Sequence, residues 1–102
     1  MQNKPKLTII KIGGKVLNNE AALNEILKDF SAIEGPKIIV HGGGSDATEL
    51  ATKLGLEAKM VNGRRITDAP MLDIVVMTYA GLLNKKIVAK LSALQSPAIG
   101  LT

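Results

Sequence analysis

Two glycine clusters are the features of this sequence whose residue types most directly suggest chemistry. Gly13 and Gly14 follow the apolar segment 7–12 (LTIIKI), and three consecutive glycines at 42–44 follow the apolar segment 37–41 (KIIVH). Glycine allows backbone N–H groups to approach a ligand closely, and such loops bind anions. The first pair could instead serve only as a tight turn, but three glycines in a row are harder to explain in that way. The clusters therefore predict a site for an anionic small molecule.

Basic side chains near these clusters could complete the site. Lys11 stands inside an otherwise apolar segment, where an unpaired charge is costly. Its tip either reaches water at the strand end or points into the glycine-lined cleft as a point charge for phosphate. Arg64 and Arg65 follow a predicted turn. One of the two arginines is predicted to bind a carboxylate as a fork, and the other to be a solvated loop charge.

Other glycine motifs fit this stretch less well. Residues 42–47 match the dinucleotide fingerprint, but Asn62 stands where the acidic residue that binds the ribose is expected. The segment HGGG, which begins at His41, resembles the oxyanion loop of lipases, yet the sequence has no G-x-S-x-G elbow. A phosphate-binding loop of the Walker type would need a glycine at position 9, which is Ile9.

Strands and helices alternate along the first half of the predicted structure. The segments 7–12 and 37–41 are rich in β-branched residues and nearly all apolar, which is typical of strands buried on both faces of a parallel sheet. Two stretches carry apolar residues at helical spacing. The first predicts a helix that is capped by Asn18 or Asn19 and stopped by Gly35-Pro36, and the second predicts a helix from about residue 46 to Gly55.

The second half continues with a turn at Asn62-Gly63 and a long helix capped by Thr67 or Asp68. We expect this helix to bend or break at Gly81. A further strand is predicted at 98–102. This order predicts the α/β class, with a mainly parallel sheet between two helical layers, and a site at the carboxyl ends of the strands.

Composition limits the classes of function. A chain of 102 residues suits one domain, and 46% hydrophobic residues predict a packed core. The net charge is +4, but the lysines are scattered along the chain, and 2% aromatic residues are too few to stack nucleic acid bases. No nucleic-acid partner is therefore expected. There is no cysteine, no signal-peptide pattern and no apolar run long enough to span a membrane. We therefore expect a cytoplasmic protein without a membrane partner.

An ordered set of segments resembles the amino acid kinase family, and within it the N-acetylglutamate kinases. The segments are IIKIGGK, IIVHGGG, KMVNGRRIT, AGLLNK and AIGLT, and they span nearly the whole chain. The resemblance implies a truncated amino acid kinase (carbamate kinase-like) fold. Residues 1–102 would be the N-terminal, acylglutamate-binding part of a single kinase domain, and the C-terminal half would carry most of the nucleotide site.

The resemblance also implies a role for each site residue. Lys11 would be catalytic and stabilise the transferring phosphoryl group, while Gly13 and Gly14 would lie against the phosphates. Gly43 and Gly44 would bind the substrate through backbone amides, and the side chain of Arg65 would hold a substrate carboxylate. No residue is expected to ligate a metal.

The implied reaction is the ATP-dependent phosphorylation of the γ-carboxylate of N-acetyl-L-glutamate, or of another N-acylglutamate, in arginine biosynthesis. Its cofactors would be ATP and Mg²⁺, with the ion bound through the nucleotide phosphates. A carboxylate nucleophile is already ionised at pH 7, so no general base is needed. The 102 residues alone are expected to be inactive, because catalysis by positioning requires both substrates to be held.

The resemblance implies a homodimer, and the apolar helix around residues 71–83 is the expected interface. Because only six residues precede the first predicted strand, the resemblance further implies insensitivity to arginine. Two alternatives stay open: a kinase of the same family that acts on glutamate, aspartate, carbamate or a nucleotide, and a non-catalytic truncated chain that binds a metabolite.

Overall fold

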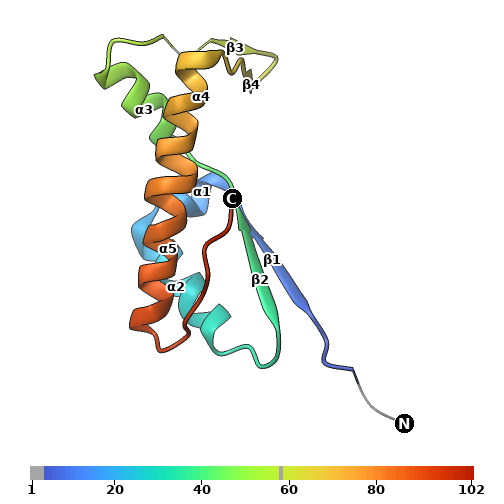
Figure 1. Cartoon of the computed structure of the whole chain (residues 1–102). Coiled ribbons are helices and arrows are strands. Elements are labelled where there is room, and N and C mark those ends of the chain that lie inside the picture. Colours follow the sequence, from blue (N-terminus) through green and yellow to red (C-terminus); the bar gives the residue numbers. More distant parts are fainter. Residues whose placement is uncertain (1–3, 58) are drawn as a thin grey trace.

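The computed structural model describes residues 4–57 and 59–102 (Figure 1). Its elements alternate much as the sequence predicts. In chain order they are β1 (Thr8–Ile12), α1 (Gly14–Leu17), α2 (Glu20–Ser31), β2 (Lys37–His41), α3 (Asp46–Lys53), β3 (Met60–Val61), β4 (Arg64–Arg65), α4 (Ala69–Val75), the π-helical segment η1 (Val76–Leu83) and α5 (Asn84–Ala93).

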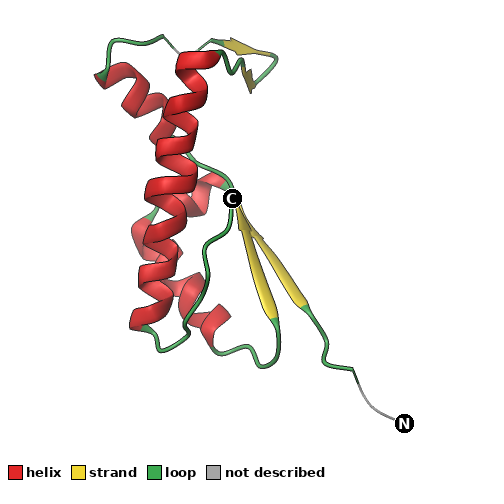
Figure 2. Ribbon diagram, in the orientation of Figure 1, coloured by secondary structure: helices red, strands yellow, loops and turns green. Residues whose placement is uncertain are grey.

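The main sheet consists of β1 and β2, which pair in parallel from Thr8 opposite Lys37 to Ile12 opposite His41. The helix α2 makes the crossover, and α1, α2 and α5 all lie on one side of the two strands (Figure 2). The α/β class and the parallel pairing are therefore confirmed.

The expected burial of both sheet faces is not found. Ile9, Ile38 and Val40 point to the side without helices and are 61%, 46% and 46% exposed. The reason is that the described residues supply one helical layer, whereas the apolar pattern of the strands predicts two. We call this side of β1 and β2 the open face.

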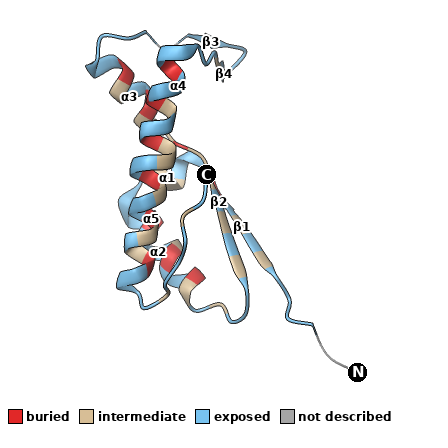
Figure 3. Ribbon diagram, in the orientation of Figure 1, coloured by how far each residue is buried: buried red, intermediate tan, exposed pale blue. Residues whose placement is uncertain are grey.

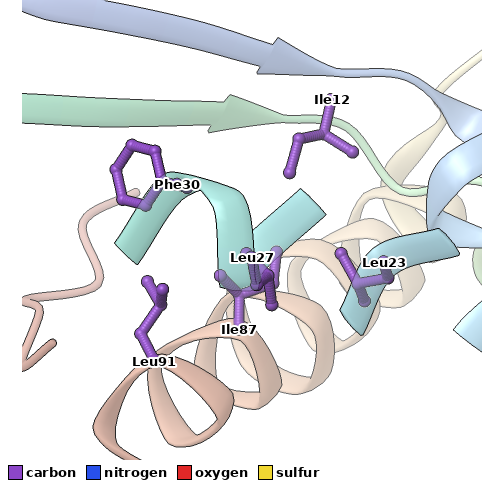
Figure 4. Close-up of a cluster of buried hydrophobic side chains, with 6 residues drawn as sticks. All are labelled: Ile12, Leu23, Leu27, Phe30, Ile87 and Leu91. Atoms are coloured by element: carbon purple, nitrogen blue, oxygen red, sulfur yellow. The ribbon is translucent and has the colours of Figure 1, made fainter. Parts of the chain in front are cut away.

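Most of the buried residues, which are red on the ribbon of Figure 3, belong to two clusters. The sheet cluster joins β1, α2 and α5, and Figure 4 shows its members: Ile12, Leu23, Leu27, Phe30, Ile87 and Leu91. The α3 cluster joins α3 to α4, and its members are Ala47, Ala51, Met71 and Ile74. Apolar burial of this kind is the main stabilising contribution to the fold.

Both ends of α2 are capped by side chains. At its start, Asn19, one of the two caps that the sequence predicts, accepts a hydrogen bond from the Ala22 N–H at 3.0 Å. At its end, the Lys37 ammonium comes from β2 and donates to three backbone carbonyls, which are those of Phe30 (2.9 Å), Ser31 (3.1 Å) and Ile33 (2.6 Å). A cation there adds a charged donor to the carbonyls at and just after the end of the helix and complements its dipole.

An ion-pair cluster joins the start of α2 to α5. The Glu20 carboxylate contacts the ammonium groups of Lys86 at 3.0 Å and Lys90 at 2.7 Å. The hydrogen bond from Lys90, followed by that from Lys86, holds the pKa of the Glu20 carboxyl below its usual value of 4.5.

The predicted long helix is present but does not break at Gly81. Asp68 caps it by accepting from the Met71 N–H at 3.0 Å, and α4, η1 and α5 then follow one another without a break (Figure 1). Gly81 lies within η1, so the irregularity takes the form of a wider π-helical turn. Such turns occur often at functional sites.

The predicted strand at 98–102 is not formed. Its carbonyls instead accept hydrogen bonds from side chains: Lys85 donates to Gly100 at 3.0 Å and Asn84 donates to Leu101 at 3.0 Å. A cavity of about 470 Å³ lies between this segment, β2 and α5. Within the described ranges, no helix combines the length and apolar character that crossing a membrane requires.

Candidate active site

The two glycine loops lie side by side at the carboxyl ends of β1 and β2. A Cβ added to Gly14 would stand 3.5 Å from the Cα of Gly44, so the two loops lie within one side-chain atom of each other. The Asn18 side-chain oxygen bridges the loops by accepting from the Ser45 N–H (3.0 Å) and hydroxyl (3.1 Å). The structure therefore brings together the two glycine clusters that the sequence singles out.

The glycines of these loops are required for different reasons. Gly44 has a φ of +58°, and a Cβ there would also overlap the side-chain oxygen of Asn18. At Gly13 and Gly42, an added Cβ would meet no heavy atom within 4 Å, and neither φ is left-handed. Packing among the described residues therefore does not require glycine at these two positions, which leaves an open approach to the backbone.

Gly43 is buried against a residue far away in the sequence, a contact that no local pattern predicts. A Cβ on Gly43 would overlap the aromatic ring of Tyr79, which comes from η1. The glycine thus allows a side chain 36 positions further along to pack directly against the loop. The single tyrosine of the chain, within a largely apolar helix, is the only signal in the sequence that could have pointed to this contact.

The guanidinium group of Arg65 is held beside the Tyr79 ring by two hydroxyl groups. One guanidinium nitrogen (Nη1) donates to the Tyr79 hydroxyl oxygen at 2.8 Å, and the other (Nη2) donates to Thr48 of α3 at 2.8 Å. The predicted turn before it is confirmed, because Asn62 and Gly63 have φ values of 51° and 76° between β3 and β4. Arg65 is half-buried, whereas Arg64 is exposed. The structure thus distinguishes the inward arginine from the solvated one.

The electrostatics of the site favour an anion at Arg65. Both hydroxyl partners are neutral, so they orient the guanidinium without cancelling its charge. Its Nε atom is buried and has no hydrogen-bond partner among the described residues.

Lys11 is placed differently from the other candidates. It lies on the open face opposite Val40 and is exposed, so its charge is not buried within the described structure. Its side chain makes no hydrogen bond or ion pair with the residues that the structure describes. The strand position puts Lys11 two residues before the first glycine loop, but no contact joins its ammonium to either loop.

His41 anchors the second loop. Its Nδ1 is 2.8 Å from the Gly42 carbonyl, and its Nε2 is 3.3 Å from the side-chain amide nitrogen of Asn84. Because a carbonyl only accepts, Nδ1 carries the proton and Nε2 accepts from Asn84. The histidine thus links the loop to the start of α5, and both of its ring nitrogens have hydrogen-bond partners.

The comparisons with known proteins agree with this architecture. Residues 6–102 match the amino acid kinase family, and the chain belongs to that family. It is 64% identical over 99 residues to the acetylglutamate kinase of Phocaeicola vulgatus and 60% identical over 97 residues to that of Parabacteroides distasonis. The Dehalococcoides mccartyi acetylglutamate kinase is 41% identical over 99 residues.

These matches cover most of this chain but a smaller share of the relatives. The three alignments cover 97%, 95% and 94% of this chain, and 38%, 38% and 35% of the respective kinases. The chain therefore spans little more than a third of the length of the curated relatives it matches. A solved structure, that of smu.665 from Streptococcus mutans UA159, superposes with a TM-score of 0.71 at 26% identity, covering 87% of this chain and 37% of that one.

Proposed function

We propose that the complete protein phosphorylates the γ-carboxylate of N-acetyl-L-glutamate, or of another N-acylglutamate, with ATP as a step of arginine biosynthesis. The observation that carries this proposal is the 64% identity to a protein named acetylglutamate kinase, over an alignment that covers 97% of this chain. An alignment of that extent contains both glycine loops and Arg65. "Complete protein" here means the whole product of the reading frame that encodes these residues.

Each part of the site has a role in this proposal. Arg65 binds a carboxylate of the acceptor as a fork, and the backbone at Gly43 and Gly44 binds the same substrate. Gly13 and Gly14 accommodate the phosphates, supported by the open approach to Gly13. Lys11 supplies positive charge for the phosphoryl group as it moves, because phosphoryl transfer depends on positioning and charge neutralisation.

The chemistry requires no base from the chain. An oxygen of the ionised γ-carboxylate attacks the γ-phosphorus of ATP, the bond between that phosphorus and the bridging oxygen breaks, and ADP leaves with the electron pair. The products are an acyl phosphate and ADP. A site whose histidine is fully occupied by structural hydrogen bonds suits this reaction, because no proton has to be removed from the nucleophile.

Mg²⁺ enters the proposal with the nucleotide. The residues that the structure describes contain no group of three or more His, Cys, Asp or Glu side chains able to hold a metal ion. When bound to the phosphates, the ion would neutralise part of their charge. We assign none of the residues described above to its coordination, and we place the reaction in the cytoplasm, where ATP is available.

A homodimer is part of the same proposal. Along residues 71–83, one side of the helix is buried, and the other carries large exposed apolar side chains, which are Leu72, Val76, Met77 and Leu82. An exposed apolar stripe of this kind suits burial against a second copy. Sedimentation of the complete protein and of its Leu82→Glu variant tests this, since the charge should convert a dimer into monomers.

A substrate panel tests the reaction. Purified complete protein is supplied with ATP and Mg²⁺, and ADP release is measured with N-acetylglutamate, N-succinylglutamate, glutamate, aspartate and carbamate. We expect turnover with an N-acylglutamate well above that with the other three acceptors. Turnover only with glutamate, aspartate or carbamate would overturn the proposed acceptor while leaving the family assignment intact.

A further inference from the structure

We infer that Tyr79 is a positioning residue: its hydroxyl group, together with that of Thr48, aims the Arg65 guanidinium at the acceptor carboxylate. This inference rests on the proposed function, because it takes Arg65 as the carboxylate-binding group. Tyr79 is not among the site residues that the sequence predicts.

The strand that carries Arg65 cannot fix the arginine side chain alone. β4 has two residues, and its partner strand β3 is exposed, with Met60 at 55% and Val61 at 53%. An arginine side chain loses about 2 kcal/mol of rotamer free energy when it is held in one conformation. Contacts from other elements must therefore hold the guanidinium in place.

The hydroxyl groups of Tyr79 and Thr48 provide such contacts from two directions. Tyr79 and Thr48 come from two different helices, and each accepts a hydrogen bond of 2.8 Å from a different guanidinium nitrogen. Together with the covalent attachment of the guanidinium through Nε, these two contacts fix the orientation of its plane. The Tyr79 ring is itself held by its close packing against Gly43, so the loop backbone, the tyrosine and the arginine form one connected unit.

The hydroxyl contacts also leave the positive charge of Arg65 available to a ligand. A guanidinium has five N–H donors, and the two hydroxyl contacts use two of them, so three donors are left. A carboxylate in place of either hydroxyl would orient the arginine as well, but it would compete with the ligand for its charge. Hydroxyl partners orient the group and keep it cationic, which is what recognition of an anionic substrate requires.

The variants Tyr79→Phe and Thr48→Val test the inference in the complete protein. Phenylalanine keeps the ring against Gly43 and removes only the hydroxyl group, while valine removes the hydroxyl of Thr48 at nearly constant volume. We expect each variant to raise the KM for the acylglutamate about tenfold, the typical effect of losing one hydrogen bond to a charged group. The kcat and the KM for ATP should stay within about twofold, and Thr48→Ser should restore the wild-type KM.

Arg65→Ala separates failure of this inference from failure of the proposed function. If Arg65→Ala raises the acylglutamate KM but Tyr79→Phe and Thr48→Val leave it within twofold, the hydroxyls do not position the arginine and the inference is wrong. If Arg65→Ala also leaves that KM unchanged, the assignment of Arg65 in the proposed function is wrong, and this inference falls with it.

A second readout does not depend on turnover. In ¹⁵N-labelled protein, the Arg65 Nε–H should give a resonance with restricted motion on the picosecond to nanosecond timescale. In Tyr79→Phe, that resonance should show clearly greater motion, while the thermal midpoint confirms that the variant is folded. Unchanged Arg65 dynamics in a folded Tyr79→Phe variant would overturn the inference.

Discussion

Replacing Gly43 by alanine is the most direct test of why the second loop is glycine-rich. The added Cβ would overlap three atoms of the Tyr79 ring. The ring cannot simply swing away, because its hydroxyl is hydrogen-bonded to Arg65. Overpacking in a well-packed site typically costs about 1–3 kcal/mol, and losing a hydrogen bond to a charged group costs about 1.5–3 kcal/mol. Since Gly43 has no left-handed φ, backbone strain adds nothing, and overlap with the ring together with a weakened hydrogen bond should cost about 3 kcal/mol.

The measurement is urea-induced unfolding followed by circular dichroism, with two controls. Gly42→Ala is the matched control, because its Cβ would meet no atom within 4 Å, so its cost should stay within about 0.5 kcal/mol. The second control is a double-mutant cycle with Tyr79→Ala. In that background the ring is gone, and Gly43→Ala should cost less than about 0.5 kcal/mol.

The cycle also gives the result that would refute the reasoning. If Gly43→Ala costs the same free energy with and without the Tyr79 ring, then the ring is not what excludes a side chain at position 43. The glycine would then be needed for another reason, such as the approach of a ligand to the backbone.

Substitutions at three charged residues, and the isolated 102-residue chain itself, give further tests. Lys37→Met should destabilise the fold by about 2 kcal/mol, because three carbonyls at and just after the end of α2 lose a charged donor. Lys28→Met, an exposed change in the last turn of α2, should be nearly neutral in thermal melts. Glu20→Gln should reduce the dependence of stability on acid: the lowered folded-state pKa stabilises the native state above the usual value of 4.5, and this contribution is lost as the pH falls through the folded-state pKa. Lys11→Ala in the complete protein should lower kcat about 10²- to 10³-fold with unchanged thermal stability, since the side chain is exposed; a kcat above half of wild type would remove it from the mechanism. A polypeptide of these 102 residues alone should release no ADP above a no-enzyme control in the presence of an acylglutamate.

Local chemistry accounts for what the sequence could predict of the fold. Asn19 and Asp68 were recognisable as helix caps because a cap requires only a side chain and an N–H three residues away. The turn at Asn62-Gly63 was recognisable because both residues tolerate the left-handed conformation that it uses. Such features need no knowledge of the rest of the chain.

Contacts between distant residues account for what it could not predict. The packing of Tyr79 on Gly43 joins two elements that no local pattern relates, so the glycines suggested a ligand where one of them makes room for a ring. The strand pattern was also a poor guide to exposure. Apolar residues such as Ile9 and Val40 indicate that a strand is suited to burial, but they do not indicate which part of a protein buries them. For the site, the sequence predicted the adjacent loops, while the roles of Lys11 and Arg65 stay predictions.

The division of the interior into two clusters has a consequence for hydrogen exchange. The sheet cluster and the α3 cluster share no buried residue, and the chain passes between them through the 42–44 loop and the helix α4–η1–α5. Units of this kind open separately, each with its own free energy. Amides of α3 and α4 should therefore exchange at rates independent of those of α2 and β2. In the proposed function the acceptor binds at Arg65 and the phosphates at Gly13, so both substrates bound together would bridge the two units and should slow exchange in both.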